Sequence, residues 1–182
     1  MLSLRDIMGN MSKGQSAIGV RHILNAYEQI YQKVSSAIKI LGAKKSASST
    51  TVYMAIPSED KSEKSYMVVL LIDSIDKFTL DTKLKIYSNA PSFLFNFAYI
   101  FNQKDSLLFP NKYANEFLTM PPKVRNPFGT LGFEKHVFSA IRFVSDYKLS
   151  RIINEFNGRT IPNVPTIRFQ LNRSTGKKEL VS

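Results

Sequence analysis

The chain has 182 residues, of which 43% are hydrophobic, and its 25 Lys+Arg exceed its 14 Asp+Glu to give a formal net charge of +11. This length fits one ordinary domain, and the apolar content is too high for a wholly disordered basic protein. The absence of cysteine excludes disulfides, thiolate metal sites and cysteine nucleophiles. No apolar run reaches the roughly 18 residues that a transmembrane helix needs, so we expect no membrane contact.

The first segment, residues 1–14, contains Gly9, Asn10 and Gly14 and shows no helical periodicity. We therefore expect an N-terminal arm, and the absence of a long apolar stretch argues against a signal peptide. Residues 15–41 instead carry apolar side chains at alternating steps of three and four, namely Val20, Leu24, Tyr27, Tyr31, Val34, Ile38 and Leu41. This spacing predicts one long amphipathic helix that packs on a sheet, with helix-mediated oligomerisation as the weaker alternative.

The middle of the chain has the patterns of β-strands. Residues 42–51 are small and polar and predict a loop, after which Val52–Ile56 forms a short strand. Tyr66–Ile72 is continuously apolar, which is typical of a central strand buried on both faces. Residues 78–87 alternate between apolar and polar side chains and predict a half-buried strand. The aromatic run Phe93–Phe101 also predicts a strand.

The last third begins with a proline-rich loop that leads into an amphipathic pattern at 131–146, which predicts a second helix. Apolar residues at 149–156 continue or follow that helix, and Thr166–Leu171 predicts a short strand. Beyond residue 160 the chain reads as a basic C-terminal tail over 161–182. We therefore expect an α+β fold in which a single domain over 15–160 has an antiparallel sheet packed by both helices, with extended terminal arms.

The net charge is unevenly distributed along the chain. Residues 1–50 carry +5, residues 51–120 carry −1 and residues 121–182 carry +7. A basic excess outside the sheet-forming centre indicates a surface that meets nucleic acid or an acidic protein, although a charge that only aids solubility is the competing interpretation. The candidate contact residues are Lys123, Arg125, Arg168, Arg173, Lys177 and Lys178.

The triplet Asp81-Thr82-Lys83 is the strongest indication of an enzyme, because alternate residues of a strand share a face. It resembles the acid-x-lysine motif of magnesium nucleases with the restriction-endonuclease-like fold, in which Asp60 or Asp73 would be the preceding acid. Its carboxylates would hold the metal ion and Lys83 would stabilise the phosphate charge. Other polar residues share that face, so we favour a solvated strand face and keep the nuclease as an alternative.

No further pattern predicts catalysis. His22 and His136 lie beside apolar residues of predicted helices, so we expect both to be partly buried structural side chains. The chain has no glycine-rich phosphate loop and no G-x-S-x-G motif. The aromatic run Phe93–Phe101 could stack on bases, but no basic residue lies within it, so we expect it to pack in the core. We expect no enzyme activity, cofactor, metal ion or small-molecule substrate.

Two stretches, IYSNAPSFLFNFAYIFN (86–102) and MPPKVRNPFGTLGFEKHVFSAIRFV (120–144), resemble segments of virion-associated or uncharacterised proteins of large tailed bacteriophages. The resemblance implies a non-enzymatic virion structural subunit of the head–tail junction, tail or baseplate, assembled in the host cytoplasm. It further implies a homo-oligomeric ring that contacts other virion subunits. A small basic nucleic-acid-binding protein and a metal-dependent nuclease using Asp73, Asp81 and Lys83 remain the alternatives.

Overall fold

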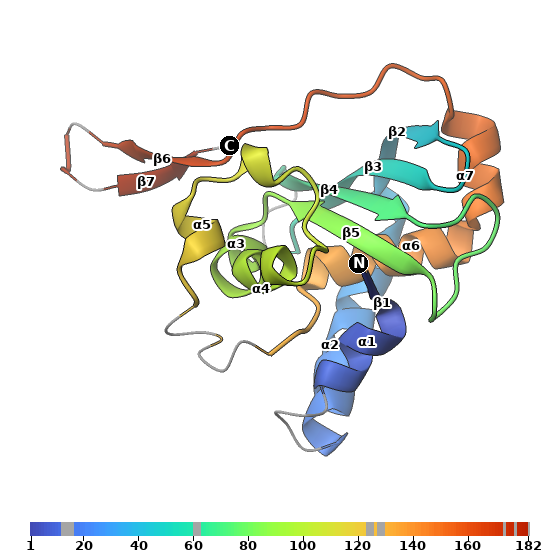
Figure 1. Ribbon diagram of the computed structural model, residues 1–182, viewed down its shortest axis with the longest axis horizontal. Helices are drawn as coiled ribbons and strands as arrows, with labels where there is room; N and C mark the ends of the chain where they lie inside the picture. Colours follow the sequence, from blue (N-terminus) through green and yellow to red (C-terminus); the bar gives the residue numbers. More distant parts are fainter. Residues whose placement is uncertain are drawn as a thin grey trace.

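The protein has an α+β fold built on a five-stranded antiparallel sheet (Figure 1). This computed structural model describes residues 1–11, 17–59, 63–122, 126, 130–172, 174–176 and 178–181. The strand order is β1-β5-β4-β3-β2, which confirms the predicted fold class. The strands of this sheet are β1 (Leu2–Ser3), β2 (Lys39–Lys45), β3 (Thr50–Pro57), β4 (Ser65–Ile72) and β5 (Lys83–Ser88).

The centre of the sheet is the apolar strand β4, which pairs with β3 on one side and β5 on the other. Val68, Val69 and Leu70 are successive residues that point to opposite faces, and all three are fully buried. Both faces of the sheet are therefore covered, as the continuous apolar run predicted.

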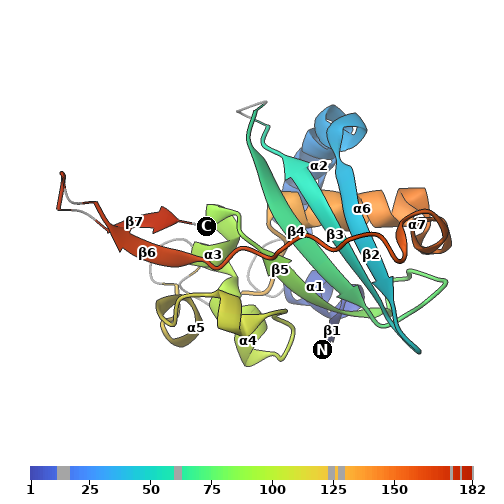
Figure 2. The ribbon, with the colours of Figure 1, turned by 90° about the horizontal axis from the view of Figure 1, so that it is seen from above.

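Two helices cover one face of the sheet (Figure 2). α6 (Lys135–Tyr147) contacts β3 and β4, and α2 (Ala17–Val34) packs on α6. The Tyr31 hydroxyl donates a hydrogen bond to Asp146 at 2.8 Å, and the rings of Tyr27 and Phe138 lie 5.7 Å apart. The second predicted helix is thus confirmed, beginning at residue 135 instead of 131.

The predicted helix over 15–41 is too long, because α2 ends at Val34 and a 3₁₀ turn, η1 (Ser35–Ala37), follows it. Ile38 and Leu41 continue the helical spacing only by coincidence, since the chain from Lys39 pairs with β3 and gains the hydrogen bonds of a ladder. The predicted loop over 42–51 is correspondingly wrong, and only a short turn at residues 46–49 joins β2 to β3.

The expectation that residues 1–14 lack helical structure is wrong for Leu4–Met11, which form α1. The start of α1 is capped reciprocally, since the Ser3 amide and hydroxyl donate to Asp6 Oδ2 and the Asp6 amide donates to Ser3 Oγ. Leu4, Ile7 and Met11 are buried along one side of the helix. Gly9 and Asn10 interrupt the apolar spacing of this helix in the sequence. The feature that could have predicted the helix is Ser3 three residues before Asp6, which is the spacing of an N-terminal capping box.

The aromatic run at 93–101 is helical, contrary to the predicted strand. It forms α3 (Pro91–Asn96) and α4 (Ala98–Gln103), with Pro91 in the first turn of α3. In this run aromatic rings recur at every second position, which places them on one face of a strand. Phe93, Phe97 and Phe101 are also four residues apart, so they lie on one side of a helix equally well. Phe93 and Phe101 are in the core, as expected, but Phe95 is 45% exposed.

The strand predicted over 78–87 is only partly correct, because β5 begins at Lys83. The preceding residues form a turn in which the Thr82 amide donates to the Thr79 carbonyl at 3.2 Å. The Leu80 carbonyl accepts a hydrogen bond from the Arg5 amide at 2.9 Å, which ties this turn to α1. Leu80 itself is 48% exposed instead of facing the core.

The second face of the sheet is covered by an extended segment, residues 157–167, which we call the strap. It leaves α7 (Leu149–Phe156) and crosses the sheet from β2 towards β5 (Figure 2). It is held at one end by the Lys45 amide, which donates to Asn157 Oδ1 at 2.9 Å, and further on by Tyr87, whose hydroxyl donates to the Pro165 carbonyl at 2.8 Å. Most of the strap was expected to belong to the tail, yet it completes the core.

The strap ends at Ile167, which is fully buried. Its amide donates to the Lys112 carbonyl at 2.7 Å, and its carbonyl accepts from the Ala114 amide at 2.8 Å. These partners belong to the connection between η2 (Pro110–Lys112) and α5 (Glu116–Thr119). The strap therefore joins the sheet to the helical layer formed by α3, α4 and α5.

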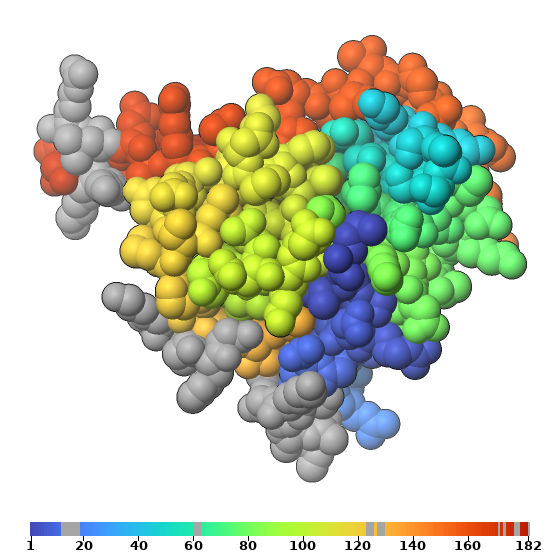
Figure 3. Space-filling view, viewed as in Figure 1, coloured from blue at the N-terminus to red at the C-terminus, as the bar shows by residue number. Residues whose placement is uncertain are grey.

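After the strap, β6 (Arg168–Leu171) and β7 (Lys178–Val181) form a separate two-stranded antiparallel sheet. The short predicted strand is confirmed as β6, whereas the expected polar tail is wrong for β7. The hairpin stands out from one end of the molecule (Figures 1 and 3). We refer to residues 168–181 as the hairpin.

Two tyrosines under the strap are expected to make the fold sensitive to alkali. Burial raises the pKa of Tyr87 and of Tyr113, and the Tyr113 hydroxyl accepts from the Ser88 amide at 3.1 Å. Above about pH 10 the unfolded chain loses phenolic protons that the folded chain keeps, so stability present below that pH is lost as the pH rises. Each tyrosine contributes a fall of up to about 1.4 kcal/mol per pH unit.

Urea unfolding between about pH 8 and about pH 11 measures this dependence. The Tyr87→Phe variant should lose one tyrosine's share of the slope above about pH 10. An equal slope in the variant and the natural chain would contradict the assignment. Burial also raises the pKa of Tyr53, so Tyr53→Phe should reduce the slope as well, but by less, since Tyr53 keeps 7% of its surface and Tyr87 keeps none.

Candidate functional site

Of the six basic residues predicted to contact a partner, the structure places Arg168 on β6 with an exposed side chain. Lys178 lies in β7, and its backbone pairs with Leu171. The remaining four, Lys123, Arg125, Arg173 and Lys177, lie outside the described residues. Arg168 and Lys178 are thus brought into one hairpin, which the sequence did not predict.

The hairpin has a locally determined geometry. The register places Arg168 opposite Val181, Phe169 opposite Leu180 and Gln170 opposite Glu179. In the connection, Asn172 Oδ1 accepts hydrogen bonds from the amides of Ser174 and Thr175, at 2.9 and 3.2 Å. Gly176 has φ +66°, a conformation that glycine adopts without strain. An asparagine turn and a glycine therefore reverse the chain here.

The edges of the main sheet are protected against pairing with another chain. β2 carries the exposed lysines Lys39, Lys44 and Lys45, and a register shift interrupts it between Ile40 and Gly42. α7 packs beside β2, and β1 at the other edge has only two residues. Lysines, bulges and short strands are the devices that block sheet extension. In the described part of the chain β6 and β7 pair only with each other, so their outer edges stay open.

Aromatic rings connect the hairpin to the body. Phe169 of β6 stacks on Phe117 of α5 with ring centroids 5.1 Å apart, and Phe95 of α3 contacts Phe117 edge-on at 5.4 Å. Phe95 is 45% exposed, and Met120 at the end of α5 is 53% exposed. We call these two exposed side chains, Phe95 and Met120, the apolar knob.

The described residues proposed for a metal nuclease are Asp73, Asp81 and Lys83, and the Asp73 amide donates to the Lys83 carbonyl at 2.9 Å. Asp81 lies in the turn before β5, and its Oδ1 and Oδ2 accept from Arg5 Nε and Nη2 at 2.6 and 3.1 Å. The hydrogen bonds from Arg5 hold the pKa of the Asp81 carboxyl below its usual range. Asp60 lies outside the described residues, and within those residues no three His, Cys, Asp or Glu side chains converge.

A buried polar cluster lies at the start of α6. Glu134 caps the helix, because Oε2 accepts from the amides of His136 and Val137 at 3.0 and 3.2 Å. Its Oε1 accepts from the Ser92 hydroxyl at 2.8 Å and lies 2.6 Å from His136 Nδ1. His136 is buried against the ring of Tyr66, as expected, whereas His22 is exposed on α2. The cluster is closed to solvent and acts as a structural joint between α3 and α6.

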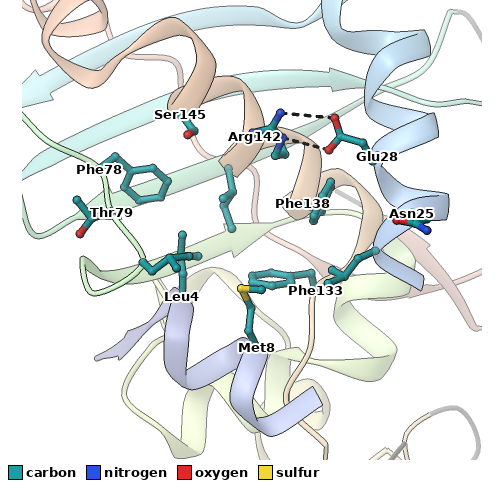
Figure 4. A pocket seen from close by; sticks show the side chains of 13 residues that line it. Leu4, Met8, Asn25, Glu28, Phe78, Thr79, Phe133, Phe138, Arg142 and Ser145 are labelled. Carbon is teal, nitrogen blue, oxygen red and sulfur yellow. Dashed lines mark hydrogen bonds and ion pairs between the residues drawn. The ribbon is translucent and has the colours of Figure 1, made fainter. Parts of the chain in front are cut away.

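A cavity of about 490 Å³ opens between α1, α2, α6 and the turn at residues 78–80 (Figure 4). In this view Phe78 and Leu4 lie on the same side of the cavity, and Met8 and Phe133 lie at its lower end. At one end the Glu28 carboxylate accepts from Arg142 Nε at 3.1 Å. Its volume and mostly apolar lining are those of binding cavities. The remaining lining residues are Leu24, Asn25, Thr79, Leu80, Phe138, Ile141 and Ser145.

Comparisons of this chain with protein-family models, with curated protein sequences and with solved structures found no match. Within the described residues, no helix combines the length and the apolarity that crossing a membrane requires. Three features of the described residues are candidates for function: the open hairpin, the apolar knob and the cavity.

Proposed function

We propose that this protein is a non-enzymatic structural subunit of a bacteriophage particle, which assembles through contacts between chains. The observation that carries the assembly role is the hairpin, which leaves the body and keeps both outer strand edges open among the described residues. The resemblance of residues 86–102 and 120–144 to proteins of tailed bacteriophages supports the phage context.

Among the described residues of the hairpin, Phe169 and Leu180 are the apolar side chains that pack against the core. A two-stranded sheet is marginally stable on its own in water, and this one contacts the body through Phe169 at its base. Its edges expose backbone N–H and C=O groups in the arrangement that another strand can pair with. Pairing with a neighbouring chain would give these N–H and C=O groups hydrogen-bond partners and bury more of the hairpin. Assembly would therefore stabilise the hairpin.

A chain that ends at Ile167 tests the proposal. It retains the strap with its hydrogen bonds to Lys112 and Ala114 but lacks the hairpin. We expect the full chain to form a defined oligomer in analytical ultracentrifugation and the shortened chain to remain a monomer at the same concentrations. Thermal unfolding of both should show that the body remains folded.

Mass spectrometry and electron microscopy of purified particles provide the second measurement. We expect the full chain to be a stoichiometric component of the virion. A chain that is monomeric at all accessible concentrations and absent from particles would contradict the proposal.

The same two chains also distinguish a nucleic-acid partner. The hairpin has four basic residues, Arg168, Arg173, Lys177 and Lys178, against one acidic residue, Glu179. If DNA or RNA were the partner, a monomeric full chain would bind it with an affinity that falls steeply with salt, and the shortened chain would lose that binding. That result would replace the assembly role by a nucleic-acid-binding one.

A further inference from the structure

The cavity between α1, α2, α6 and the turn at residues 78–80 has no part in the proposed assembly role, which rests on the hairpin. Its volume of about 490 Å³ lies in the range of sites that bind small organic molecules. Met8 and Leu80 belong to its lining and are 38% and 48% exposed, so the single chain leaves large apolar side chains in contact with water here. A molecule inside the cavity would cover them.

Hydrogen bonds between the walls hold the cavity open without a ligand. The Arg5 amide of α1 donates to the Leu80 carbonyl at 2.9 Å, which joins α1 to the turn. Across the cavity, Arg142 of α6 donates to Glu28 of α2 at 3.1 Å (Figure 4). The walls are therefore ordered in advance, and a preformed cavity binds a ligand without the cost of ordering its surroundings.

The charged groups at the cavity are already engaged with one another. Arg142 Nε and Nη2 donate to the Glu28 carboxylate at 3.1 and 3.5 Å, and Arg142 Nη1 lies 3.2 Å from Asp146 Oδ1. Glu28 Oε1 also accepts from Gln32 Nε2 at 2.9 Å. An anion would lie beside two carboxylates, and a cation would meet carboxylates that Arg142 already binds. A charged ligand would thus lose its hydration without gaining a partner, so the cavity favours an uncharged molecule.

The rest of the lining defines that molecule more closely. Phe78, Phe133 and Phe138 contribute aromatic rings from three parts of the chain, and the last two meet edge-on with centroids 6.2 Å apart. Aromatic groups of a ligand gain specific contacts with such rings in addition to their burial. The exposed side chains of Asn25 and Ser145 have no hydrogen-bond partner among the described residues, so they are available to a hydroxyl or amide group.

We propose that the cavity binds an uncharged small molecule that is mostly aromatic or otherwise apolar and has one hydroxyl or amide group. The apolar part lies among the phenylalanine rings and covers Met8 and Leu80, and the polar group bonds to Asn25 or Ser145. The proposal does not rest on the assembly role, because the hairpin contributes no residue to the lining.

Three probes that share one ring system test the preference for an uncharged ligand. Near neutral pH naphthalene-1-methanol is uncharged, 1-naphthoate is an anion and 1-naphthylmethylammonium is a cation. Calorimetric titration of the full chain should show saturable one-to-one binding of the alcohol, about tenfold or more tighter than the binding of either ion. An alcohol that does not saturate, or an ion that binds as tightly as the alcohol, overturns the proposal.

Two substitutions that fill the cavity locate the binding site. Ser145→Phe adds a ring from α6 and Asn25→Phe adds one from α2, so the second variant still tests the site if the first unfolds. Ser150→Phe is the matched control, because Ser150 is exposed on α7 and lies outside the lining. These positions are exposed, so each variant should unfold within a few degrees of the natural chain.

We expect either filling variant to bind naphthalene-1-methanol about tenfold or more weakly than the natural chain, and Ser150→Phe to bind it equally well. Unchanged binding by the filling variants would place the probe elsewhere and overturn the proposal. The mass of the natural chain in the same solutions separates the two roles. A monomer that binds the alcohol supports the cavity site and contradicts assembly, whereas an oligomer that does not bind it overturns the cavity site alone.

Discussion

Replacing Glu134 with alanine should lower the free energy of unfolding by about 3–5 kcal/mol, the largest effect expected for a polar residue of this protein. The Glu134 carboxyl group is 2% exposed on its side chain and accepts from two backbone amides of α6 and from the Ser92 hydroxyl. An N-cap contributes about 1 kcal/mol, and each buried group left without a partner costs about 1–3 kcal/mol. His136 Nδ1 also loses its neighbour, and its Nε2 has no protein partner.

Urea unfolding of Glu134→Ala beside Glu155→Ala tests this expectation. The Glu155 carboxylate likewise accepts hydrogen bonds from side chains, namely the Tyr147 hydroxyl and Arg151 Nε, but it lies at the surface. Its replacement should therefore change stability by less than about 1 kcal/mol. Adding Ser92→Ala to Glu134→Ala should cost less than the Ser92→Ala change does alone, because the two side chains share one hydrogen bond. Similar losses for Glu134→Ala and Glu155→Ala would show that the buried cluster does not hold α6.

Replacing Ile167 with alanine should cost about 2–5 kcal/mol, the range for removing a large aliphatic side chain from a closed core site. Ile167 is fully buried, and its backbone is hydrogen-bonded to Lys112 and Ala114 on both sides. The neighbouring backbone is thereby fixed and cannot move in to fill the space that the side chain leaves. The strap thus contributes to the core as a strand would, although it pairs with its neighbours at isolated positions.

Thr166→Ala is the control for Ile167→Ala, because Thr166 is exposed in the same extended segment. It should change the free energy of unfolding by no more than about 0.5 kcal/mol. Chemical denaturation of both variants measures the difference. A small loss for Ile167→Ala would indicate that the strap is detachable, and the chain that ends at Ile167 would then be a poor representation of the folded body.

The fold was predictable wherever burial and local pattern agreed. Tyr66–Ile72 is continuously apolar because β4 is covered by α6 on one face and by the strap on the other. The predicted and observed elements differ where one pattern fits two structures. Ile38 and Leu41 fit a helical stripe and a strand equally, and only pairing with β3 decides between them. The aromatic run at 93–101 is ambiguous in the same way.

The candidate site was less predictable than the fold. The sequence could predict that Arg168 lies exposed on a short strand, because both properties are local. The cavity could not, because its lining comes from four separate segments whose separate patterns each indicate only core packing. The acid-x-lysine triplet is a local pattern whose spacing suggested a metal site. In the structure the Asp81 carboxylate instead accepts a hydrogen bond from Arg5, 76 positions away in the chain, and the sequence could not predict this partner.

Composition, charge and the local spacing of apolar residues determined that this is an α+β chain without cysteine, with a near-neutral centre between basic ends. These properties are sums over residues or repeat along the chain, so they do not depend on which distant segments meet. The position of the hairpin, the closure of the second sheet face by the strap, and the cavity were decided only by the tertiary structure. Each arises from contacts between segments far apart in sequence, and such contacts leave no periodic trace in either partner.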